Sequence, residues 1–127
     1  MYAELKRAWN ELTSPGHIFE VQRKEVRGVD ILTYVHAPNS LRDIWISSAN
    51  YGDRDYIVYQ DERISYREAH RRVAAVAQGL SDMGVAPGDR VAIAMRNYPE
   101  WMLAHWAITS IGAVVVGMNA WWVPHEM

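Results

Sequence analysis

Four basic side chains near the middle of the chain have the composition of an anion-binding site. Such a site would hold a phosphate or a carboxylate through positive charge. The alternative is a solvated helix face. We adopt this second interpretation, because all four residues lie near the start of a predicted helix, where the helix dipole disfavours cations. The residues are Arg67, His70, Arg71 and Arg72.

The histidines do not have the spacing of a metal site. His70 has no second ligand four residues further on, the spacing that places two ligands on one face of a helix. His105 and His125 are equally isolated in the sequence. We expect a surface or capping role for them.

Polar and aromatic residues follow two predicted strands and are candidates for a ligand crevice. Ligands of open α/β sheets bind beyond the carboxyl ends of the strands, where Asn97 stands in this chain. Asn97 can also serve as the N-cap of the next helix, and we prefer this interpretation. Trp121 and Trp122 could line an apolar substrate groove, but exposed tandem tryptophans more often mark an interface with structure outside the sequence.

No catalytic, cofactor-binding or metal-binding residue is assigned to this chain. It lacks both the Gly-x-Gly-x-x-Gly dinucleotide motif and the Gly-x-x-x-x-Gly-Lys-Ser/Thr phosphate loop, which disfavours a small nucleotide binder. The net charge of −2 argues against a nucleic-acid partner, and the absence of cysteine excludes disulfides and thiolate metal sites. The longest apolar run, residues 111–118, is far shorter than the ~20 residues of a membrane span. We therefore expect no transmembrane segment and a cytoplasmic location.

Residues 84–119 contain the elements that would position these candidates. Apolar runs at residues 90–95 and 113–118 predict two strands, and Pro99 and Gly112 delimit a helix between them. Continuous apolar runs are typical of parallel strands that are buried on both faces. The sequence therefore predicts a β-α-β unit with parallel strands. Its buried strand residues should include Val91, Ile93, Val114 and Val116.

A hairpin and a long helix precede this unit. Residues 56–66 alternate in character around a turn at residues 60–62, which predicts the hairpin. Ser65 and Glu68 match a capping box, in which each side chain satisfies the free amide of the other residue. A helix is therefore expected to begin at Tyr66. Its inner face comprises Ala69, Val73, Val76, Leu80 and Met83, and Gly84 follows its end.

The first fifty residues carry weaker patterns. An apolar stripe in residues 3–12 predicts a helix that packs on the body of the protein or, as the alternative, binds a partner. Residues 18–35 predict two extended segments with a turn at residues 27–28. A further helix starts after Ser40, whose hydroxyl can cap it. Its inner face comprises Leu41, Ile44, Trp45 and Ser48.

The predicted helix at residues 99–111 is apolar on almost all sides. Such a helix has to be buried over most of its surface, and a chain of 127 residues offers few neighbours to cover it. We interpret this pattern as a sign that the chain is a piece of a larger protein.

Long segments of the chain, taken in order, carry a family resemblance. They are YIVYQDERISY at residues 56–66, AVAQGLSDMGVAPGDRVAIAMRNYPEW at residues 75–101 and GAVVVGMNAWW at residues 112–122. These segments resemble the N-terminal part of the adenylate-forming enzymes, and within them the fatty acyl-CoA synthetases. Upstream, FEVQRKEVRGVD and NSLRDIW resemble the entry segment of the same enzymes.

The resemblance implies an α/β fold class, with N-terminal β-hairpin elements and a β-α-β unit of parallel strands. These elements would form part of the large N-terminal domain of the adenylate-forming fold. Residues 1–52 would be the entry segment, and residues 53–127 the hairpin and α/β subdomain.

For function, the resemblance implies the N-terminal scaffold of an ATP-dependent fatty acyl-CoA synthetase, inactive by itself. The full enzyme would use ATP, magnesium and coenzyme A to convert a carboxylate into an acyl-adenylate and then a thioester, and none of these cofactors is expected on this chain. Its partners would be the remainder of the same enzyme and a fatty acid, or an aryl or other carboxylate. The alternative is a stand-alone interaction or oligomerisation module. We also expect the isolated chain to self-associate.

Overall fold

The structure is a computed structural model that describes residues 1–123, 125 and 126. Contacts within the chain divide it into two compact units, Met1–Asn39 and Ser40–Met127. The division predicted at residue 52 stays a prediction, although the helix after Ser40 belongs with the second unit.

The first unit contains helix α1 (Tyr2–Leu12) and a hairpin of strands β1 (Val21–Val26) and β2 (Val29–Tyr34). The hairpin is antiparallel, and its two-residue loop consists of Arg27 and Gly28, both with positive φ. Two positive φ angles are what a tight turn between twisted strands requires, so the predicted turn is confirmed. No residue of α1 is buried, and its packing on a body stays a prediction.

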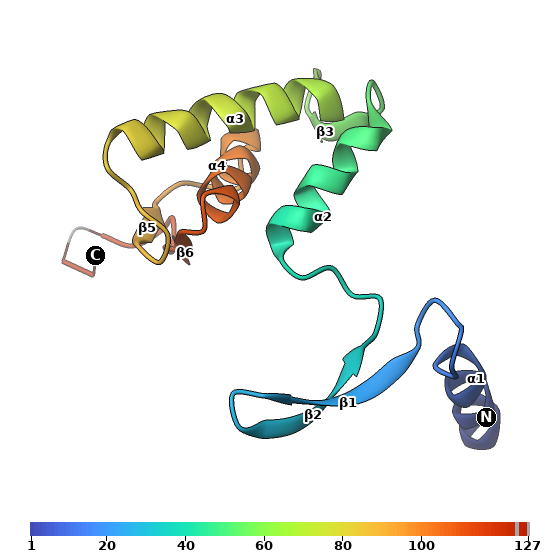
Figure 1. The fold of residues 1–127 in the computed structure, drawn as a ribbon. Coiled ribbons are helices and arrows are strands. Elements are labelled where there is room, and N and C mark those ends of the chain that lie inside the picture. Colours follow the sequence, from blue (N-terminus) through green and yellow to red (C-terminus); the bar gives the residue numbers. More distant parts are fainter. Residues whose placement is uncertain (124, 127) are drawn as a thin grey trace. The chain divides into compact units, whose positions relative to one another are not determined.

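The second unit contains the remaining elements (Figure 1). In chain order they are α2 (Leu41–Ser48), the short 3-10 helix η1 (Ala49–Tyr51), β3 (Asp55–Tyr59), β4 (Glu62–Ser65), α3 (Tyr66–Asp82), β5 (Arg90–Ile93), α4 (Pro99–Ser110) and β6 (Val114–Gly117). Strands β3 and β4 form an antiparallel hairpin, and β5 and β6 form a parallel pair. The predicted α/β class, hairpin and β-α-β unit are therefore confirmed.

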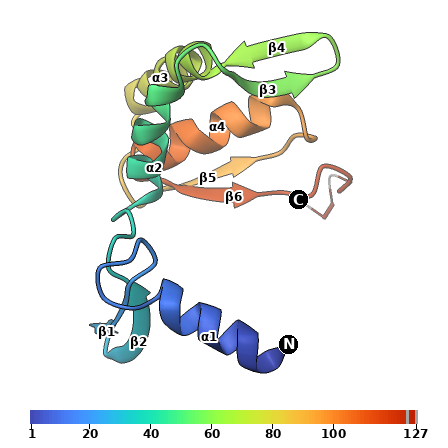
Figure 2. The same ribbon diagram turned by 90° about the vertical axis from the view of Figure 1, so that its right-hand side faces the viewer.

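Three layers build this unit: α3, then α4, then the β5–β6 pair (Figure 2). One core cluster joins α2, β4, α3 and α4 and contains Trp45, Ile64, Ala69, Val73, Leu103 and Ala107. A second cluster lies between α4 and the strands and contains Ile93, Ile108 and Ala113. Helix α4 is thus the middle layer and contributes to both clusters. Its all-round apolar character follows from this position, although Met102 remains exposed.

The prediction that β5 and β6 are buried on both faces is wrong for this chain. Ile93 is 2% exposed and Val91 is half-buried on the face that α4 covers. Val114 and Val116 are 47% and 38% exposed. Successive strand residues point to opposite faces, so α4 can cover only one set. The residues of the other face, Val114 and Val116, are therefore left partly exposed within this unit.

The caps of two helices follow the sequence closely. The Ser40 hydroxyl accepts a hydrogen bond from the Asp43 amide (3.1 Å), and the Ser65 hydroxyl accepts one from the Glu68 amide (3.2 Å). The second half of the predicted capping box is wrong, because the Glu68 carboxylate binds two arginines instead of the Ser65 amide. The charge of a guanidinium makes it the stronger partner for a carboxylate.

Several predicted inner-face residues are exposed. On α3, Ala69 and Val73 are buried, whereas Val76 and Met83 are exposed. On α2, only Trp45 is buried, while Leu41 and Ile44 are exposed. Periodicity identifies the side of a helix that faces the core but not how far the neighbouring element extends along it.

Within the described residues, no helix has both the length and the apolar character needed to cross a membrane.

Two glycines provide a matched test of the backbone. Gly112 follows the end of α4 with φ at +79°, and an added Cβ would lie 3.3 Å from Pro87 Cβ. The substitution Gly112→Ala should therefore lower the free energy of unfolding by about 1–2 kcal/mol. Gly79 lies inside α3 with no atom within 4 Å of an added Cβ, so Gly79→Ala should raise it by about 0.5–1 kcal/mol. Urea unfolding followed by circular dichroism measures both. Equal effects of the same sign would contradict the assigned backbone conformations.

Candidate functional site

A crevice lies at the carboxyl ends of β5 and β6, the edge of a parallel sheet where ligands bind in open α/β folds. Its volume is ≈ 480 Å³, which is in the range of small-ligand sites. The residues that line it are Met95, Asn97, Trp101, Gly117, Met118, Asn119, Ala120 and Trp121.

Local hydrogen bonds shape the walls of this crevice. The Met118 amide donates to the Ile93 carbonyl (3.1 Å) and extends the pairing of the strands to their ends. The Asn119 side-chain oxygen then accepts from the Trp121 amide (3.0 Å), which turns the chain beyond β6. The Arg96 guanidinium lies over the Trp121 ring, 4.1 Å from its centroid. A cation over an indole face is attractive and holds Trp121 beside the crevice.

The crevice can bind but has no group for acid-base or nucleophilic chemistry. Its lining combines two carboxamides, two indole rings and two thioethers, and none of these side chains titrates near neutral pH. It therefore offers apolar walls and hydrogen-bonding groups without a catalytic acid, base or nucleophile.

The structure brings together two of the predicted candidates. Asn97 and Trp121 both line the crevice, whereas Trp122 does not. The prediction that Asn97 caps the next helix is wrong, because Tyr98 occupies the N-cap position of α4 and its side chain makes no capping bond. Because Pro99 takes the first helical position, the N-cap falls on Tyr98, one residue after Asn97. Trp121 is 72% exposed, so an interface with further structure stays an open interpretation.

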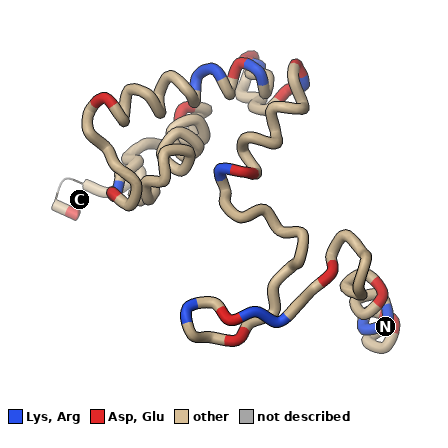
Figure 3. Tube along the Cα trace, in the orientation of Figure 1, with Lys and Arg blue, Asp and Glu red and all other residues tan. Residues whose placement is uncertain are grey.

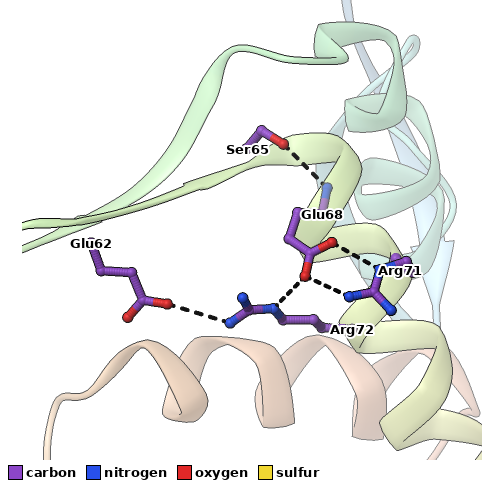
Figure 4. Close-up of polar contacts among 5 residues, drawn as sticks. All are labelled: Glu62, Ser65, Glu68, Arg71 and Arg72. Carbon is purple, nitrogen blue, oxygen red and sulfur yellow. Dashed lines mark hydrogen bonds and ion pairs between the residues drawn. The ribbon is translucent and has the colours of Figure 1, made fainter.

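Two of the four basic residues, Arg71 and Arg72, are paired with carboxylates (Figure 4). Glu68 accepts from both Arg71 (2.7 and 2.8 Å) and Arg72 (2.7 Å), and Arg72 also reaches Glu62 (3.4 Å). The hydrogen bonds from Arg71 and then Arg72 lower the pKa of Glu68 from 4.5 to about 2. Glu68 is therefore ionised at neutral pH, and its negative charge offsets the positive charge of Arg71 and Arg72 that an anionic ligand would need.

Arg67 is paired in the same way, with Asp53 (2.7 and 3.1 Å). Acidic and basic residues therefore alternate around the start of α3 (Figure 3). These exposed pairs are of the kind that contributes little to stability. The arrangement supports a solvated, internally neutralised helix face for the three arginines rather than an anion site.

His70 does not belong to this face, and its assignment to it was wrong. Its ring stacks on Trp45, with centroids 4.0 Å apart and an angle of 12° between the planes. Its Nε2 lies 3.0 Å from the Ser48 hydroxyl. His70 precedes the buried Val73 by three residues, a spacing that shares one helix face. That spacing was the signal that the sequence analysis missed.

Trp45 is the centre of an aromatic stack that joins three helices. The Trp106 ring, which comes from α4, also stacks on Trp45. The ring centroids are 5.0 Å apart, and the angle between the planes is 16°. The Trp106 indole N–H donates to the Tyr56 hydroxyl, which ties the stack to β3. His105 stacks on Trp101 (5.5 Å) instead of taking the expected surface or capping role. These contacts are structural and link residues up to 61 positions apart in the chain, from Trp45 to Trp106.

The stack predicts a pH dependence of stability. Burial lowers the pKa of His70 below its ordinary value of 6.5, so the unfolded chain binds a proton more readily than the folded one. The stabilising contribution is fully present above pH 6.5 and is lost as the pH falls through the lower, folded value. Urea unfolding between pH 7.5 and 5 should show this loss, and His70→Phe should reduce it. His125→Gln, at an exposed position, is the control; an unchanged slope in His70→Phe would contradict the assignment.

Residues 44–127 match the sequence model of the AMP-binding enzyme family. The chain is 38% identical over 72 residues to the medium/long-chain-fatty-acid–CoA ligase FadD6 of Mycobacterium tuberculosis, a match that covers 57% of this chain and 12% of FadD6. It is 45% identical over 69 residues to acetyl-coenzyme A synthetase of Salmonella typhi, with 50% and 11% covered.

A solved structure with the same fold is the N-terminal subdomain of Klebsiella oxytoca NpsA in complex with 3-hydroxyanthranilyl-AMSN. It matches with a TM-score of 0.65 and 29% identity, over 68% of this chain and 22% of that chain. The chain thus spans a small part of the length of these relatives.

Proposed function

Because the chain belongs to the AMP-binding enzyme family, we propose that it is the N-terminal scaffold portion of an ATP-dependent acyl-CoA synthetase. The whole enzyme would activate a carboxylate with Mg-ATP to an acyl-adenylate, release pyrophosphate and pass the acyl group to the thiol of coenzyme A. The observation that carries this proposal is the family match over residues 44–127, which includes the complete β5-α4-β6 unit.

Among the described residues, neither the crevice nor the start of α3 fits Mg-ATP. A triphosphate with its magnesium needs cationic donors and carboxylate ligands that converge on one point. Here the crevice is lined by uncharged side chains, and Arg67, Arg71 and Arg72 are paired with local carboxylates. Within the described residues, no three His, Asp or Glu side chains are grouped to hold a metal ion. The proposed contribution of the chain is therefore to build and position one wall of the enzyme, and no chemical step is assigned to it.

For the acid, we propose a fatty acid. The support is the similarity to FadD6, whose name describes a medium/long-chain-fatty-acid–CoA ligase. Acetyl-coenzyme A synthetase and the NpsA complex with a 3-hydroxyanthranilyl group support a short-chain or aryl acid as the alternative. All three names describe a protein that activates or binds a carboxylic acyl group, and this is the broader substrate class that they have in common.

Pyrophosphate release tests this proposal. The purified chain, with ATP, magnesium and a panel of fatty and aryl acids, should release no pyrophosphate above background, because neither the crevice nor the start of α3 offers groups that hold ATP and a metal ion. The parent enzyme from the same gene should release pyrophosphate in response to a fatty acid. Turnover by the 127-residue chain that survives further purification would contradict the scaffold role, and an inactive parent would contradict the synthetase.

The alternative function is a stand-alone interaction or oligomerisation module. It is favoured by the apolar surface that this chain exposes near its end, above all by Trp121 at 72% exposure and Trp122 at 41%. Contiguous apolar patches of several hundred Å² are uncommon on monomers and mark interaction sites. A gene in which coding sequence continues past Met127 into a Ser/Thr/Gly-rich loop would favour the enzyme over this alternative.

Self-association of the isolated chain follows from the same exposed surface. Multi-angle light scattering at increasing concentration should show species larger than one chain, because burying the indole rings removes apolar area from water. Trp121→Ser with Trp122→Ser should shift the species toward the monomer. Trp9→Ser, which removes an exposed tryptophan from α1, is the matched control and should not. A clean monomer at high concentration with both tryptophans intact would contradict self-association.

A further inference from the structure

A hollow of ≈ 340 Å³ lies between α2 and α3, close to the carboxyl end of α4. Helix α4 packs against both of these helices. The small side chains that α3 contributes leave the space between the helices open, and we call it the α2–α3 cleft. It shares no lining residue with the crevice at the strand ends. Its apolar lining includes Trp45, Val73, Ala74, Ala77 and Ile111.

Two polar side chains at the α2–α3 cleft have no partner among the described residues. The Ser110 Oγ is buried and makes no hydrogen bond there. Arg42 lines the same cleft, and the ion pairs of the described residues all involve other basic groups. The remaining polar lining residues, His70, Gln78 and Ser81, each make a hydrogen bond within the unit.

These two side chains call for the same kind of missing partner. A buried hydroxyl without a hydrogen bond is costly, and in folded proteins such a group nearly always bonds to protein, water or a ligand. Arg42 is the one charged side chain that lines the cleft among the described residues, so the site carries a positive charge. A guanidinium forms its strongest hydrogen bonds with anionic oxygens, and a hydroxyl can donate to the same group. The missing partner is therefore an anionic acceptor.

The apolar walls and the size of the cleft narrow the class of anion. A volume of ≈ 340 Å³ is near the lower end of the range of small-molecule sites, and such sites combine apolar walls with a few polar groups. One exposed arginine suits a single negative charge better than the two charges of a phosphate. The buried Val73 and the neighbouring Ala77 offer contact to an apolar tail.

We propose that the α2–α3 cleft binds a small amphipathic carboxylate, with its carboxylate group on Arg42 and Ser110 and its short apolar tail along α3. This inference is independent of the proposed function, because it is drawn from the residues of the cleft alone. A ligand in this place adds contacts to Trp45, the one buried residue of α2. Its binding therefore stabilises the packing of α2 on the other two helices.

Two matched probes test the charge that the site requires. Octanoate carries a carboxylate, and octanamide has the same tail and nearly the same shape without the charge. Each is titrated into the 127-residue chain, at a concentration where scattering shows a monomer, and followed by two-dimensional amide NMR. Octanoate should shift the amide signals near Arg42 and Ser110 saturably, and octanamide should bind about tenfold more weakly. Added salt should weaken octanoate alone, because Arg42 is exposed.

Substitutions of the polar groups locate the carboxylate. Arg42→Gln should weaken octanoate binding about tenfold, and Ser110→Ala should weaken it about fivefold, because each removes a hydrogen bond to the charged group. Neither change should alter the binding of octanamide by more than about twofold, because the apolar walls remain. Arg90→Gln removes the same charge from an exposed position outside the cleft and is the control.

A substitution in the wall tests the space itself. Ala74→Leu places a branched side chain in the cleft and should abolish the saturable shifts of both probes. Ala75→Leu, at the next and equally exposed position of α3, lies outside the lining and should leave them unchanged. Circular dichroism and urea midpoints within the range of the unsubstituted chain confirm that the variants fold.

Photoaffinity labelling extends the test to the parent enzyme. A diazirine analogue of octanoate, followed by peptide mass spectrometry, should label the peptides that contain α2 and α3 in both the 127-residue chain and the parent. An excess of octanoate should prevent the labelling. Ala74→Leu should remove it, and Ala75→Leu should not.

Five results would overturn the inference. Equal binding of octanamide and octanoate would show an apolar hollow without an anion site. Unchanged octanoate binding in Arg42→Gln would exclude the guanidinium, and unchanged binding in Ser110→Ala would show that water satisfies the hydroxyl. Octanoate shifts that persist in Ala74→Leu would place the ligand elsewhere. Labelling of the 127-residue chain but not of the parent would show that the cleft is closed in the enzyme.

Discussion

The burial of α4 between α3 and the β5–β6 pair is the packing contact on which the second unit depends. Leu103 and Ala107 enter the cluster shared with α2, β4 and α3, while Ile108 enters the cluster on the strands. A fully buried large apolar side chain contributes roughly 1.5–3 kcal/mol, so a helix that buries residues on two sides holds the layers on those sides together. The crevice at the strand ends depends on this contact, since Trp101 reaches it from the first turn of α4.

The aromatic stack around Trp45 fixes the remaining helix of this unit. Helix α2 has only one buried residue, and that residue lies between the rings of His70 and Trp106. Stacked aromatic pairs add about 0.5–1.5 kcal/mol beyond the area that they bury. Trp45 is therefore the buried anchor of α2, and the Ser48 hydroxyl beside it adds a second contact, to His70. The Tyr56 hydroxyl accepts from Trp106 and positions the other end of the stack.

Charge in this unit is balanced locally. Arginines at the start of α3 are matched by Asp53, Glu62 and Glu68, so the helix presents a neutral surface despite its basic sequence. The crevice and the exposed face of the strands carry few charges, a composition that is typical of the core of an interface. The local pairing of the three arginines argues against phosphate binding at the start of α3.

The sequence by itself determined the features whose causes are local. Ser40 and Ser65 cap helices, Arg27 and Gly28 turn a hairpin, and the apolar runs around α4 specify a parallel β-α-β unit, because each depends on residues within a few positions or on one periodic pattern. Asn97 and Trp121, which line the crevice, were both named as crevice candidates, although a helix cap was preferred for Asn97 and an interface for Trp121.

Tertiary structure alone decided which faces are covered and which side chains meet. The stacking of His70 on Trp45 and the bond from Trp106 to Tyr56 join residues 25 and 50 positions apart, and no local pattern encodes such a pairing. The exposure of Val114 and Val116 is decided in the same way, since an apolar run indicates what a strand can bury but not whether a second layer is present. Burial is a property of the neighbours that a residue has, and those neighbours are set by the packing of whole elements.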